Sequence, residues 1–491
     1  MNNNKPSSFR WVVCAMLFAA TTVNYLDRQV LSLTWKDFIA PEFKWTDNDY
    51  GTITAAFSLI YALCNLFAGK FIDWLGTKKG YLWAIFIWSL GACLHAVCGI
   101  GAFKIASLAA ISVTTVSVWL FLACRAVLAL GEAGNFPAAI KVTAEYFPKK
   151  DRAFSTSIFN SGSSVGALAA PATSPLIAKF WGWEMSFIII GALGFLWMGF
   201  WIWLYRKPSE NIRVNSAELA YIESDSDPEA DKKAAASAQA EGPRISYLQA
   251  FRLRHTWSLI LGRFLTDGVW WFFLFWTPGY LSDQFGYRSD SGMGMALIIT
   301  LYAIVTFVSI YLCRLPTYFV ERRGMNPYEG RMVSMFIFAC FPLLALAAQP
   351  LGAFSAWWPA VLIGLACAGH QAWSANVYSV VGDMFPKSTI ATLTGIAQFA
   401  AGCGSFMVNK CAGKLFSYAA GTTVVNGSEV EMTKELLAKG AQYARPAMEL
   451  FGYTGKPAGY AVVFCYCAVA YIIGWICMKT LVPKYKPVVL D

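Results

Sequence analysis

The sequence predicts an all-α polytopic membrane protein, with about twelve transmembrane helices in two pseudo-symmetric six-helix halves. Hydrophobic residues make up 57% of the 491 residues and charged residues only 14%, whereas a soluble domain carries about 25% charged residues. The apolar residues fall into long runs, and a helix needs about 20 residues to cross the hydrocarbon core of a bilayer. One long polar stretch near the middle of the chain divides these runs equally.

Each apolar run is long enough for one membrane-spanning helix. The expected spans lie near residues 9–38, 49–72, 81–103, 113–140, 153–179, 184–205, 256–283, 292–315, 331–351, 357–383, 388–416 and 458–481. The polar stretch between the sixth and seventh spans predicts an N-terminal half over residues 1–206 and a C-terminal half over residues 255–491.

Two polar segments lie outside the expected spans. Residues 207–254 are rich in Ala, Ser, Asp, Glu and Lys, and such a composition cannot bury enough apolar surface to fold by itself. We expect a soluble cytoplasmic linker there, with partial helix at most. A second polar segment near 417–457 is predicted to form an external loop, and its sequence does not indicate a function.

Cationic residues in the short loops predict the orientation in the membrane. The loops predicted to face the cytoplasm contain Lys78 and Lys79, four cationic residues over 141–152 and four over 314–331. The loops predicted to face outside contain fewer, and 352–356 contains none. Both termini are therefore expected in the cytoplasm.

An internal repeat supports two related halves. EYFPK at 145–149 corresponds to DMFPK at 383–387, and each precedes a span rich in Ser, Thr and Gly. Two six-helix repeats are typical of secondary transporters, whose substrate site lies near the membrane midplane between the repeats. Small residues in these spans are predicted to allow close helix packing, namely Gly162, Gly166, Gly402 and Gly404.

The residue content argues against an enzyme, a metal site or a nucleic-acid interface. The 13 Cys residues lack zinc-ligand spacing, the chain has only 3 His, and neither an HExxH motif nor a nucleophile motif with a base is present. The net charge of +10 comes from loops between spans rather than from one basic face. We expect no cofactor other than protons as the coupling ion, and a monomer whose partners are the lipid bilayer and a small anionic substrate.

Two helices carry charged residues at a depth where charge is costly. Asp27 and Arg28 lie in the first span, and Arg125 and Glu132 lie in the fourth. A charge at the bilayer centre costs at least about 2.5–3.5 kcal/mol and usually faces a polar cavity or an opposite charge. Arg125 and Glu132 are seven residues apart and share a helix face, whereas Asp27 and Arg28 diverge by about 100°. Two guanidiniums beside two carboxylates predict an anion site with proton-binding carboxylates.

We expect these four residues to have different roles. Arg28 should bind the substrate carboxylate, because a guanidinium matches a carboxylate with two hydrogen bonds. Asp27 should pair with Arg125, and Glu132 should be the more readily protonated carboxylate because burial disfavours the charged form. The alternative is a buried ion lattice that holds the two spans together, although buried pairs are a costly source of stability.

Neutral polar and aromatic residues of the second half are candidates for binding hydroxyl groups of the anionic substrate. They are Trp276, Thr277, His370, Gln371, Trp373, Ser374, Asn376, Tyr378 and Gln398. In the first half, Asn135 continues the face of Glu132, and Ser163 is expected at the same cavity. The alternative for His370 is a core residue of an apolar span. Arg263 and Asp267 are spaced i, i+4 and are expected to pair, as a gate or an interfacial anchor rather than a ligand.

The loop after the second span resembles a signature of the major facilitator superfamily. It reads GKFIDWLGTKK over 69–79 and keeps Asp73, Gly76 and Lys78, with Trp74 where a basic residue is common. The resemblance implies the major facilitator fold. It also implies a gating role for these three residues, in which the Asp pairs with charges on a neighbouring helix.

Further segments resemble the anion:cation symporter family within that superfamily. They are NYLDR at 24–28, GEAGNFPAA at 131–139 and FPKKDR at 147–152. GHQAWSAN at 369–376, followed by DMFPK, is most similar to hexuronate transporters, and the resemblance covers essentially the full chain.

The resemblance implies a proton-coupled symporter of the cell (inner) membrane that imports a hexuronate, such as glucuronate or galacturonate. Alternative substrates within the family are galactonate or another aldonate, an aromatic acid and an organophosphate, and a sensor that kept the transporter fold is a further alternative. The residues with implied roles are Asp27 and Glu132 in proton coupling, Arg28 at the anion, Arg125 as a charge partner, and Tyr25 and Tyr61 at the cavity.

Overall fold

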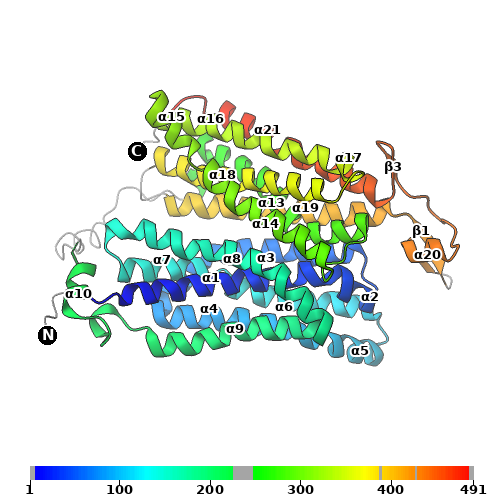
Figure 1. Cartoon of the computed structure of the whole chain (residues 1–491), viewed down its shortest axis with the longest axis horizontal. Helices are drawn as coiled ribbons and strands as arrows, with labels where there is room; N and C mark the ends of the chain where they lie inside the picture. Colours follow the sequence, from blue (N-terminus) through cyan, green and yellow to red (C-terminus); the bar gives the residue numbers. More distant parts are fainter. Residues whose placement is uncertain (1–5, 225–246, 386–389, 426–427, 486–491) are drawn as a thin grey trace.

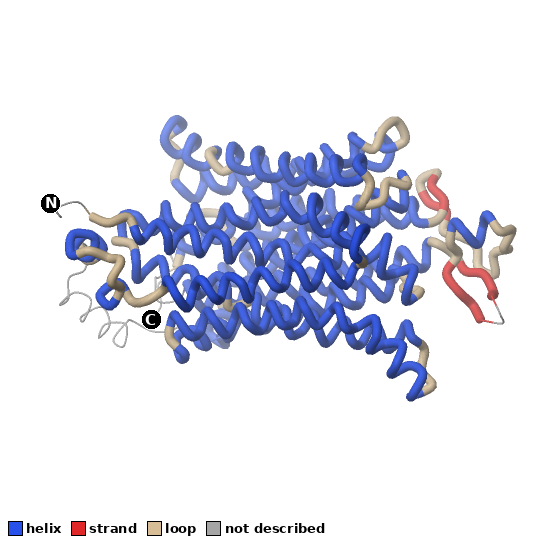
Figure 2. Tube along the Cα trace, turned by 60° about the horizontal axis from the view of Figure 1, so that its bottom comes forward, coloured by secondary structure: helices blue, strands red, loops and turns tan. Residues whose placement is uncertain are grey.

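The computed structural model of the chain is a bundle of long helices in two halves (Figure 1). The structure describes residues 6–224, 247–385, 390–425 and 428–485. Both termini lie at one end of the molecule, the terminus end, and the few strands lie at the opposite end, the hairpin end (Figures 1 and 2).

The first half contains six long helices with short helical continuations. The long helices are α1 (Phe9–Thr34), α3 (Asp47–Leu75), α4 (Thr77–Leu94), α6 (Val113–Glu132), α8 (Lys149–Trp181) and α9 (Trp183–Leu204). The continuations are the π-helical turn η1 (Trp35–Ile39) and α2 (Ala40–Phe43) after α1, η2 (His95–Val97) and α5 (Cys98–Ala109) after α4, and α7 (Asn135–Tyr146) after α6.

The second half repeats this arrangement. Its long helices are α13 (Arg254–Phe285), α14 (Gly292–Leu312), α16 (Pro327–Cys340), α18 (Trp357–Met384), α19 (Ile390–Ala419) and α21 (Lys456–Leu481). Its shorter helices are α15 (Leu315–Arg323), η4 (Phe341–Ala347) and α17 (Ala348–Gly352). Every expected span therefore has its helix, and within the described residues 9 helical stretches are long and apolar enough to cross a membrane.

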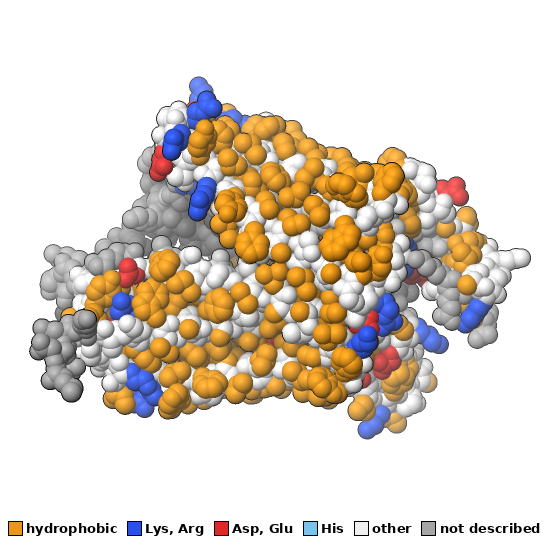
Figure 3. All heavy atoms as spheres, viewed as in Figure 1, with side chains coloured by type: hydrophobic (Ala, Val, Ile, Leu, Met, Phe, Trp, Pro, Cys, Tyr) orange, Lys and Arg blue, Asp and Glu red, His pale blue; other side chains and the backbone are white. Residues whose placement is uncertain are grey.

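The surface is that of a protein embedded in lipid. Hydrophobic side chains cover the middle of the face shown in Figure 3, and charged side chains gather towards the two ends. Large apolar side chains point outwards from several helices, with Leu196 60%, Trp203 62% and Phe307 62% exposed. In water such a continuous apolar surface would be unfavourable, whereas lipid tails solvate it.

Local signals fix the ends of α3, the helix that carries Tyr61. At its start, Asp49 N–H donates to the Thr46 hydroxyl and Thr46 N–H donates to the Asp49 carboxylate, which forms a capping box. At its end, Gly76 has φ +77°, a conformation that side chains disfavour, and turns the chain directly into α4.

Close helix contacts depend on the predicted glycines. A Cβ added at Gly162 or Gly166 of α8 would lie 2.5 Å from a carbonyl oxygen of α1. A Cβ at Gly402 of α19 would collide with α3, and one at Gly404 would collide with α13. The prediction that these glycines allow helices to approach closely is confirmed, and the contacts at α3 join the two halves.

The first part of the predicted linker packs against the first half. It contains η3 (Pro208–Glu210) and α10 (Ser216–Ile222). Glu218 is fully buried and accepts hydrogen bonds from the Phe9 N–H at 3.1 Å and the Ser7 hydroxyl at 2.5 Å, and its other oxygen pairs with Arg10 at 3.0 Å. Phe9 begins α1, and the backbone N–H groups of a first turn have no partner within the helix. The linker resumes at α12 (Tyr247–Arg252), and residues 225–246 lie outside the described part.

The predicted external loop is a small folded unit. Its strands β1 (Thr422–Val425) and β2 (Ser428–Glu431) form an antiparallel hairpin, followed by α20 (Lys434–Ala438). A second, shorter hairpin joins β3 (Glu449–Leu450) to β4 (Tyr453–Thr454). The unit is tied to the bundle because Glu431 of β2 lies 2.8 Å from the Lys456 ammonium of α21.

Candidate functional site

The charged residues of α1 and α6 meet inside the first half. Arg28 donates from Nε at 2.9 Å and from Nη2 at 2.7 Å to the same oxygen, Oε2, of Glu132. The two side chains are 5% and 0% exposed. Hydrogen bonds between ionised groups are roughly twice as strong as neutral ones. Glu132 thus occupies the donor edge of Arg28 that a substrate carboxylate would need.

Aromatic rings surround the Arg28 guanidinium. Its Cζ lies 5.1 Å from the ring centroid of Tyr25, 4.7 Å from that of Tyr61 and 5.2 Å from that of Trp271. The rings stabilise the cation through cation–π interactions and cover its faces, so an anion can reach only its edge. Trp271 belongs to α13, which places this guanidinium at the boundary between the two halves.

Asp27 and Arg125 complete the charged cluster without forming an ion pair. They are 2% and 3% exposed, and among the described residues neither Asp27 oxygen has a hydrogen-bond partner. The Oε1 atom of Glu132 and the Nη1 atom of Arg125 also have none in that part of the chain. Buried polar atoms are normally satisfied, so this cluster has spare capacity for protons, water or an anion. The expected Asp27–Arg125 pair is not present in this conformation.

The backbone around Glu132 is held by close packing of α6 on α4. A Cβ added at Gly131 would collide with the backbone of Trp88, and one at Gly91 would lie 2.6 Å from the Leu128 nitrogen. Because these positions have no side chain, the two helices lie nearly backbone to backbone. This contact fixes the face on which Arg125 and Glu132 point towards α1.

Two other predicted residues of the first half form hydrogen bonds with groups other than Arg28. Asn135 is fully buried and accepts a hydrogen bond of 2.8 Å from the Tyr81 hydroxyl of α4. Ser163 of α8 is half-buried, and its hydroxyl donates to the Asn160 carbonyl oxygen at 2.7 Å. The side chain of Asn135 is therefore used between helices of its own half.

A second ion pair lies in the second half. Arg263 Nη2 lies 2.7 Å from Asp267 Oδ2, which confirms the expected i, i+4 pair. Arg263 also donates to the Ser374 hydroxyl at 2.6 Å and to Gln398 Oε1 at 3.1 Å. The expectation of an interfacial anchor is wrong, because both charged side chains are about 95% buried, at 5% and 6% exposure, and Arg263 points towards α18 and α19.

Several predicted hydroxyl-binding residues are engaged in the core of the second half. His370 Nδ1 lies 2.7 Å from the Tyr471 hydroxyl, and its ring stacks on Trp270, so the structure supports the alternative of a core histidine. Asn376 donates to a backbone carbonyl of its own helix at 2.9 Å. Gln371 is half-buried on α18, and the side chain of Tyr378 lies outside the described part.

The predicted ligand Trp276 lies at the hairpin end, in a cluster that closes the two halves on each other. It is fully buried, and its indole N–H donates to Asn409 Oδ1 at 3.0 Å. Its ring packs edge-on against Trp35 and Tyr50, whose rings stack at 3.9 Å. The Tyr50 hydroxyl donates to the Phe275 carbonyl oxygen at 2.8 Å. Trp276 thus joins the halves instead of facing Arg28.

Ion pairs reinforce this closure at the hairpin end. Lys36, on the π-helical turn after α1, lies 3.3 Å from Asp47 and 3.0 Å from Asp283 of the second half. Lys456 of the second half lies 2.5 Å from Asp47 and 2.8 Å from Glu431. Sequence reasoning missed this network, because its residues lie on segments that are far apart in the chain.

The loop signature between α3 and α4 forms contacts at the terminus end. Asp73 pairs with Lys141 of α7 at 2.7 Å, and its side chain is 72% exposed. Lys78 donates to the Ile202 carbonyl oxygen at 3.1 Å. Gly76 forms the turn between α3 and α4. The Asp73 contact joins neighbouring helices of one half, as the resemblance implies, and the gating role stays a prediction.

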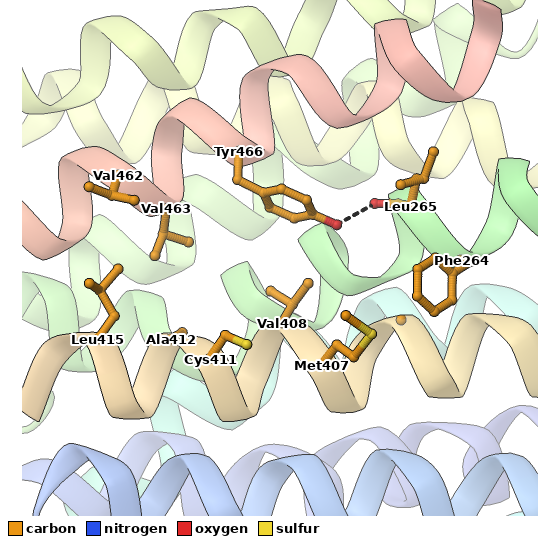
Figure 4. Close-up of a pocket in the computed structure, with 11 residues that line it drawn as sticks. Phe264, Leu265, Met407, Val408, Cys411, Ala412, Leu415, Val462, Val463 and Tyr466 are labelled. Atoms are coloured by element: carbon orange, nitrogen blue, oxygen red, sulfur yellow. Dashed lines mark hydrogen bonds between the residues drawn. The ribbon is translucent and has the colours of Figure 1, made fainter. Parts of the chain in front are cut away.

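A large apolar cavity lies elsewhere, among α13, α19 and α21 (Figure 4). Its volume is about 510 Å³, and Phe264, Met407 and Val462 are among the residues that line it. The Tyr466 hydroxyl, at its wall, donates to the Leu265 carbonyl oxygen at 3.0 Å. None of the described residues that line it is charged, so these residues offer no charged partner to an anion. Arg28 and its neighbours remain the candidate site.

Comparisons with known proteins agree with this architecture. Residues 17–408 match the family model of the Major Facilitator Superfamily. The chain belongs to this superfamily. The protein is therefore a multi-pass membrane transporter and not an enzyme. The D-xylose-proton symporter, a solved structure, has a TM-score of 0.64 and 14% identity over 98% of both chains, which supports the fold.

Relatives of this superfamily member are sugar-acid transporters. The hexuronate transporter of Escherichia coli (strain K12) is 28% identical over 416 residues, which cover 84% of this chain and 88% of the relative. The probable galactarate/D-glucarate transporter GarP of the same strain is 29% identical over 431 residues, covering 82% and 93%. The D-galactonate transporter of Escherichia coli O6:H1 is 25% identical over 424 residues, covering 84% and 91%.

Proposed function

We propose that this transporter is a proton-coupled symporter that imports a hexuronate, such as glucuronate or galacturonate, by alternating access. The observation that carries the proposal is the double hydrogen bond from Arg28 to one oxygen of Glu132. A buried guanidinium that already holds an internal carboxylate can exchange it for a substrate carboxylate of the same geometry. The names of the relatives support a sugar acid as that substrate.

Charge balance links this exchange to protons. Asp27, Arg28, Arg125 and Glu132 sum to zero when all four are ionised. A bound monoanion would leave one uncompensated charge in a buried site, which costs several kcal/mol. Protonation of Glu132 removes that excess, because the substrate then supplies the negative charge that Glu132 gives up. One proton per monoanion is therefore the smallest stoichiometry that keeps this cluster neutral.

The transport cycle follows from this competition. On the outer side, protonation of Glu132 releases Arg28, which captures the anion. After reorientation, Glu132 loses its proton to the cytoplasm, regains Arg28 and displaces the substrate. The Arg28–Glu132 contact of the structure has the arrangement expected after this release step.

The proposed orientation places the termini in the cytoplasm and the hairpin end outside the inner membrane. It rests on the cationic residues of the loops at the terminus end. In this orientation the contacts of Lys36 with Asp283 and of Lys456 with Asp47 close the outer side. Uptake from outside requires these contacts between the halves to open, as the rocking of two repeats about a central site would do.

Uptake of labelled glucuronate, galacturonate and galactonate into proteoliposomes, with and without an acidic exterior, tests the proposal. We expect a hexuronate to accumulate only under the gradient. Accumulation without a gradient would contradict proton coupling. Uptake of none of the three acids by folded protein would contradict the substrate class.

An aldonate is the second candidate substrate, and the D-galactonate transporter among the relatives favours it. An aldonate carries one carboxylate and could use the Arg28 edge in the same way. Uptake of galactonate in preference to both hexuronates would select this candidate.

A further inference from the structure

We infer that Arg263 and Asp267 bind the end of the sugar acid that lies opposite its carboxylate, and that they select an uncharged end over a second carboxylate. The inference rests on the proposed function and specifies the substrate class as a sugar monoacid rather than an aldarate. The relatives include transporters named for both classes, so similarity alone leaves this choice open.

The Arg263 guanidinium is held in place from three sides. It pairs with Asp267 one turn further along α13, and it donates to Ser374 of α18 at 2.6 Å and to Gln398 of α19 at 3.1 Å. A cation fixed by three helices has little freedom to follow a substrate. Its positive charge is already balanced by Asp267.

Asp267 has one oxygen available for a ligand. Its Oδ2 atom lies 2.7 Å from Arg263, whereas its Oδ1 atom is buried and has no hydrogen-bond partner among the described residues. A buried acceptor without a donor is unfavourable. Such an atom in a transporter indicates a place where a water molecule or a substrate hydroxyl donates a hydrogen bond.

The packing of α13 turns Asp267 towards the first half. Its two neighbours face other helices, because a Cβ at Gly474 of α21 would lie 3.4 Å from the Thr266 methyl group and a Cβ at Gly268 would lie 2.5 Å from a methyl group of α19. Trp271, four residues on, shares the side of Asp267 and contacts the Arg28 guanidinium at 5.2 Å. Four residues correspond to about 6 Å along the helix, so a six-carbon acid held by Arg28 can extend towards Asp267.

The chemistry of the pair suits a hydroxyl group. A hydroxyl can donate to Asp267 Oδ1 and accept from the Ser374 hydroxyl, which keeps its own hydrogen when it accepts from Arg263. An ionised carboxylate has no hydrogen to donate, and it would meet the negative charge of Asp267 in a site with low dielectric. A sugar acid with one carboxylate can therefore bind Arg28 with that carboxylate and Asp267 with a hydroxyl group. The second carboxylate of an aldarate is repelled by Asp267.

The test measures ligand binding to the full-length protein in detergent, from the ligand-dependent rise in unfolding temperature. The probes are galacturonate, with one carboxylate, and galactarate, with one at each end. We expect the wild type to bind galacturonate at least about tenfold more tightly than galactarate, the discrimination that 1.4 kcal/mol provides. Asp267→Asn, or Asp267→Ser as a second neutral variant, should shift this ratio about tenfold towards galactarate, because Arg263 loses its charge partner.

Two controls separate charge from packing. Asp267→Glu keeps the negative charge and should keep the preference for galacturonate. Glu329→Gln makes the same carboxylate-to-amide change on the exposed surface of the second half and should change neither affinity. An unchanged ratio in both neutral variants, or equal binding of the two acids by the wild type, would overturn the inference alone. If folded wild type bound neither acid, the proposed function would fail with it.

Discussion

The two halves of the transporter treat buried charge in different ways. In the first half, Arg28 holds Glu132, while Asp27 keeps two carboxylate oxygens without partners among the described residues. In the second half, Arg263 is engaged by Asp267 and by two neutral side chains. The cluster of the first half thus keeps carboxylate oxygens available for further partners, and the second half holds its cation fixed.

Under the proposed function, this difference combines proton coupling and substrate selectivity in one transporter. Exchange at Arg28 is possible because Glu132 can leave as a neutral acid, so no charge is left uncompensated. The fixed Arg263–Asp267 pair presents hydrogen-bond donors and acceptors to a substrate, and its own charges cancel. Variants that alter only one half should therefore affect either coupling or substrate choice.

The largest expected effect comes from Arg28→Lys. Lysine keeps the charge but loses the fork of two donors, and two charge-assisted hydrogen bonds are together worth about 3 kcal/mol, which corresponds to about a 100-fold loss of uptake. Arg125→Lys is the matched control, because Arg125 forms no fork onto a carboxylate of the described residues, and we expect a loss of only about tenfold. Initial uptake rates in proteoliposomes measure both. Equal losses would remove the special role of Arg28.

Glu132→Gln should separate coupling from binding. A gradient of one pH unit is worth about 1.4 kcal/mol per proton, so it drives about tenfold accumulation of a monoanion in the wild type. The neutral amide cannot release a proton, so accumulation should fall to about onefold while exchange of internal for external substrate continues. Measuring exchange and accumulation on the same vesicles tests this. Full accumulation by the variant would exclude Glu132 from coupling.

Ser374→Ala should change affinity in the second half and leave coupling intact. The variant removes the hydroxyl proposed to donate to a substrate hydroxyl, and a hydrogen bond between neutral groups is worth about 0.5–1.5 kcal/mol, so substrate affinity should fall by up to about tenfold. The accumulation ratio at saturating substrate should stay at the wild-type value, because no carboxylate of the first half changes. A lowered ratio would show that the second half also takes part in coupling.

The smallest effect is expected for Lys36→Met, which removes a contact between the halves. The Lys36 ammonium lies 3.0 Å from Asp283, and the two side chains are 19% and 16% exposed. A pair with this exposure is worth about 1 kcal/mol or less, so opening of the hairpin end should become up to about fivefold more frequent. The labelling rate of Gln284→Cys by an impermeant thiol reagent, above the background of the native cysteines, reports this opening. A slower rate would show that the contact does not hold the halves together.

The sequence predicted most of the fold. Long apolar runs must form helices in a bilayer, because every backbone polar group needs a partner where no water is present. The spans, the two halves and the close-packing glycines Gly162 and Gly402 therefore follow from composition and spacing. The folded unit after α19 could not be foreseen, because its short hairpins carry no period or motif that stands out.

Prediction of the site was less complete. The clustering of Arg28 with Glu132 followed from their burial in apolar spans, and Tyr61 from the resemblance. His370 and Trp276 also seemed suited to a cavity, yet the structure places His370 in the core of its half and Trp276 in the contact between the halves. His370 bonds to the Tyr471 hydroxyl, and the Trp276 indole N–H donates to Asn409 of α19. No pattern within one helix reveals such partners.

The sequence by itself determined that this protein spans a membrane in two related halves and that four ions are buried in the first. Only the tertiary structure decided that Arg28 donates to Glu132 rather than leaving its donors available to a substrate. The same holds for Arg263, which is fixed by Asp267 and two further helices. The physical reason is that residue spacing fixes which side chains share a face of one helix. The rotation of that helix against its neighbours, which determines what the face meets, depends on contacts between segments that are far apart in the chain.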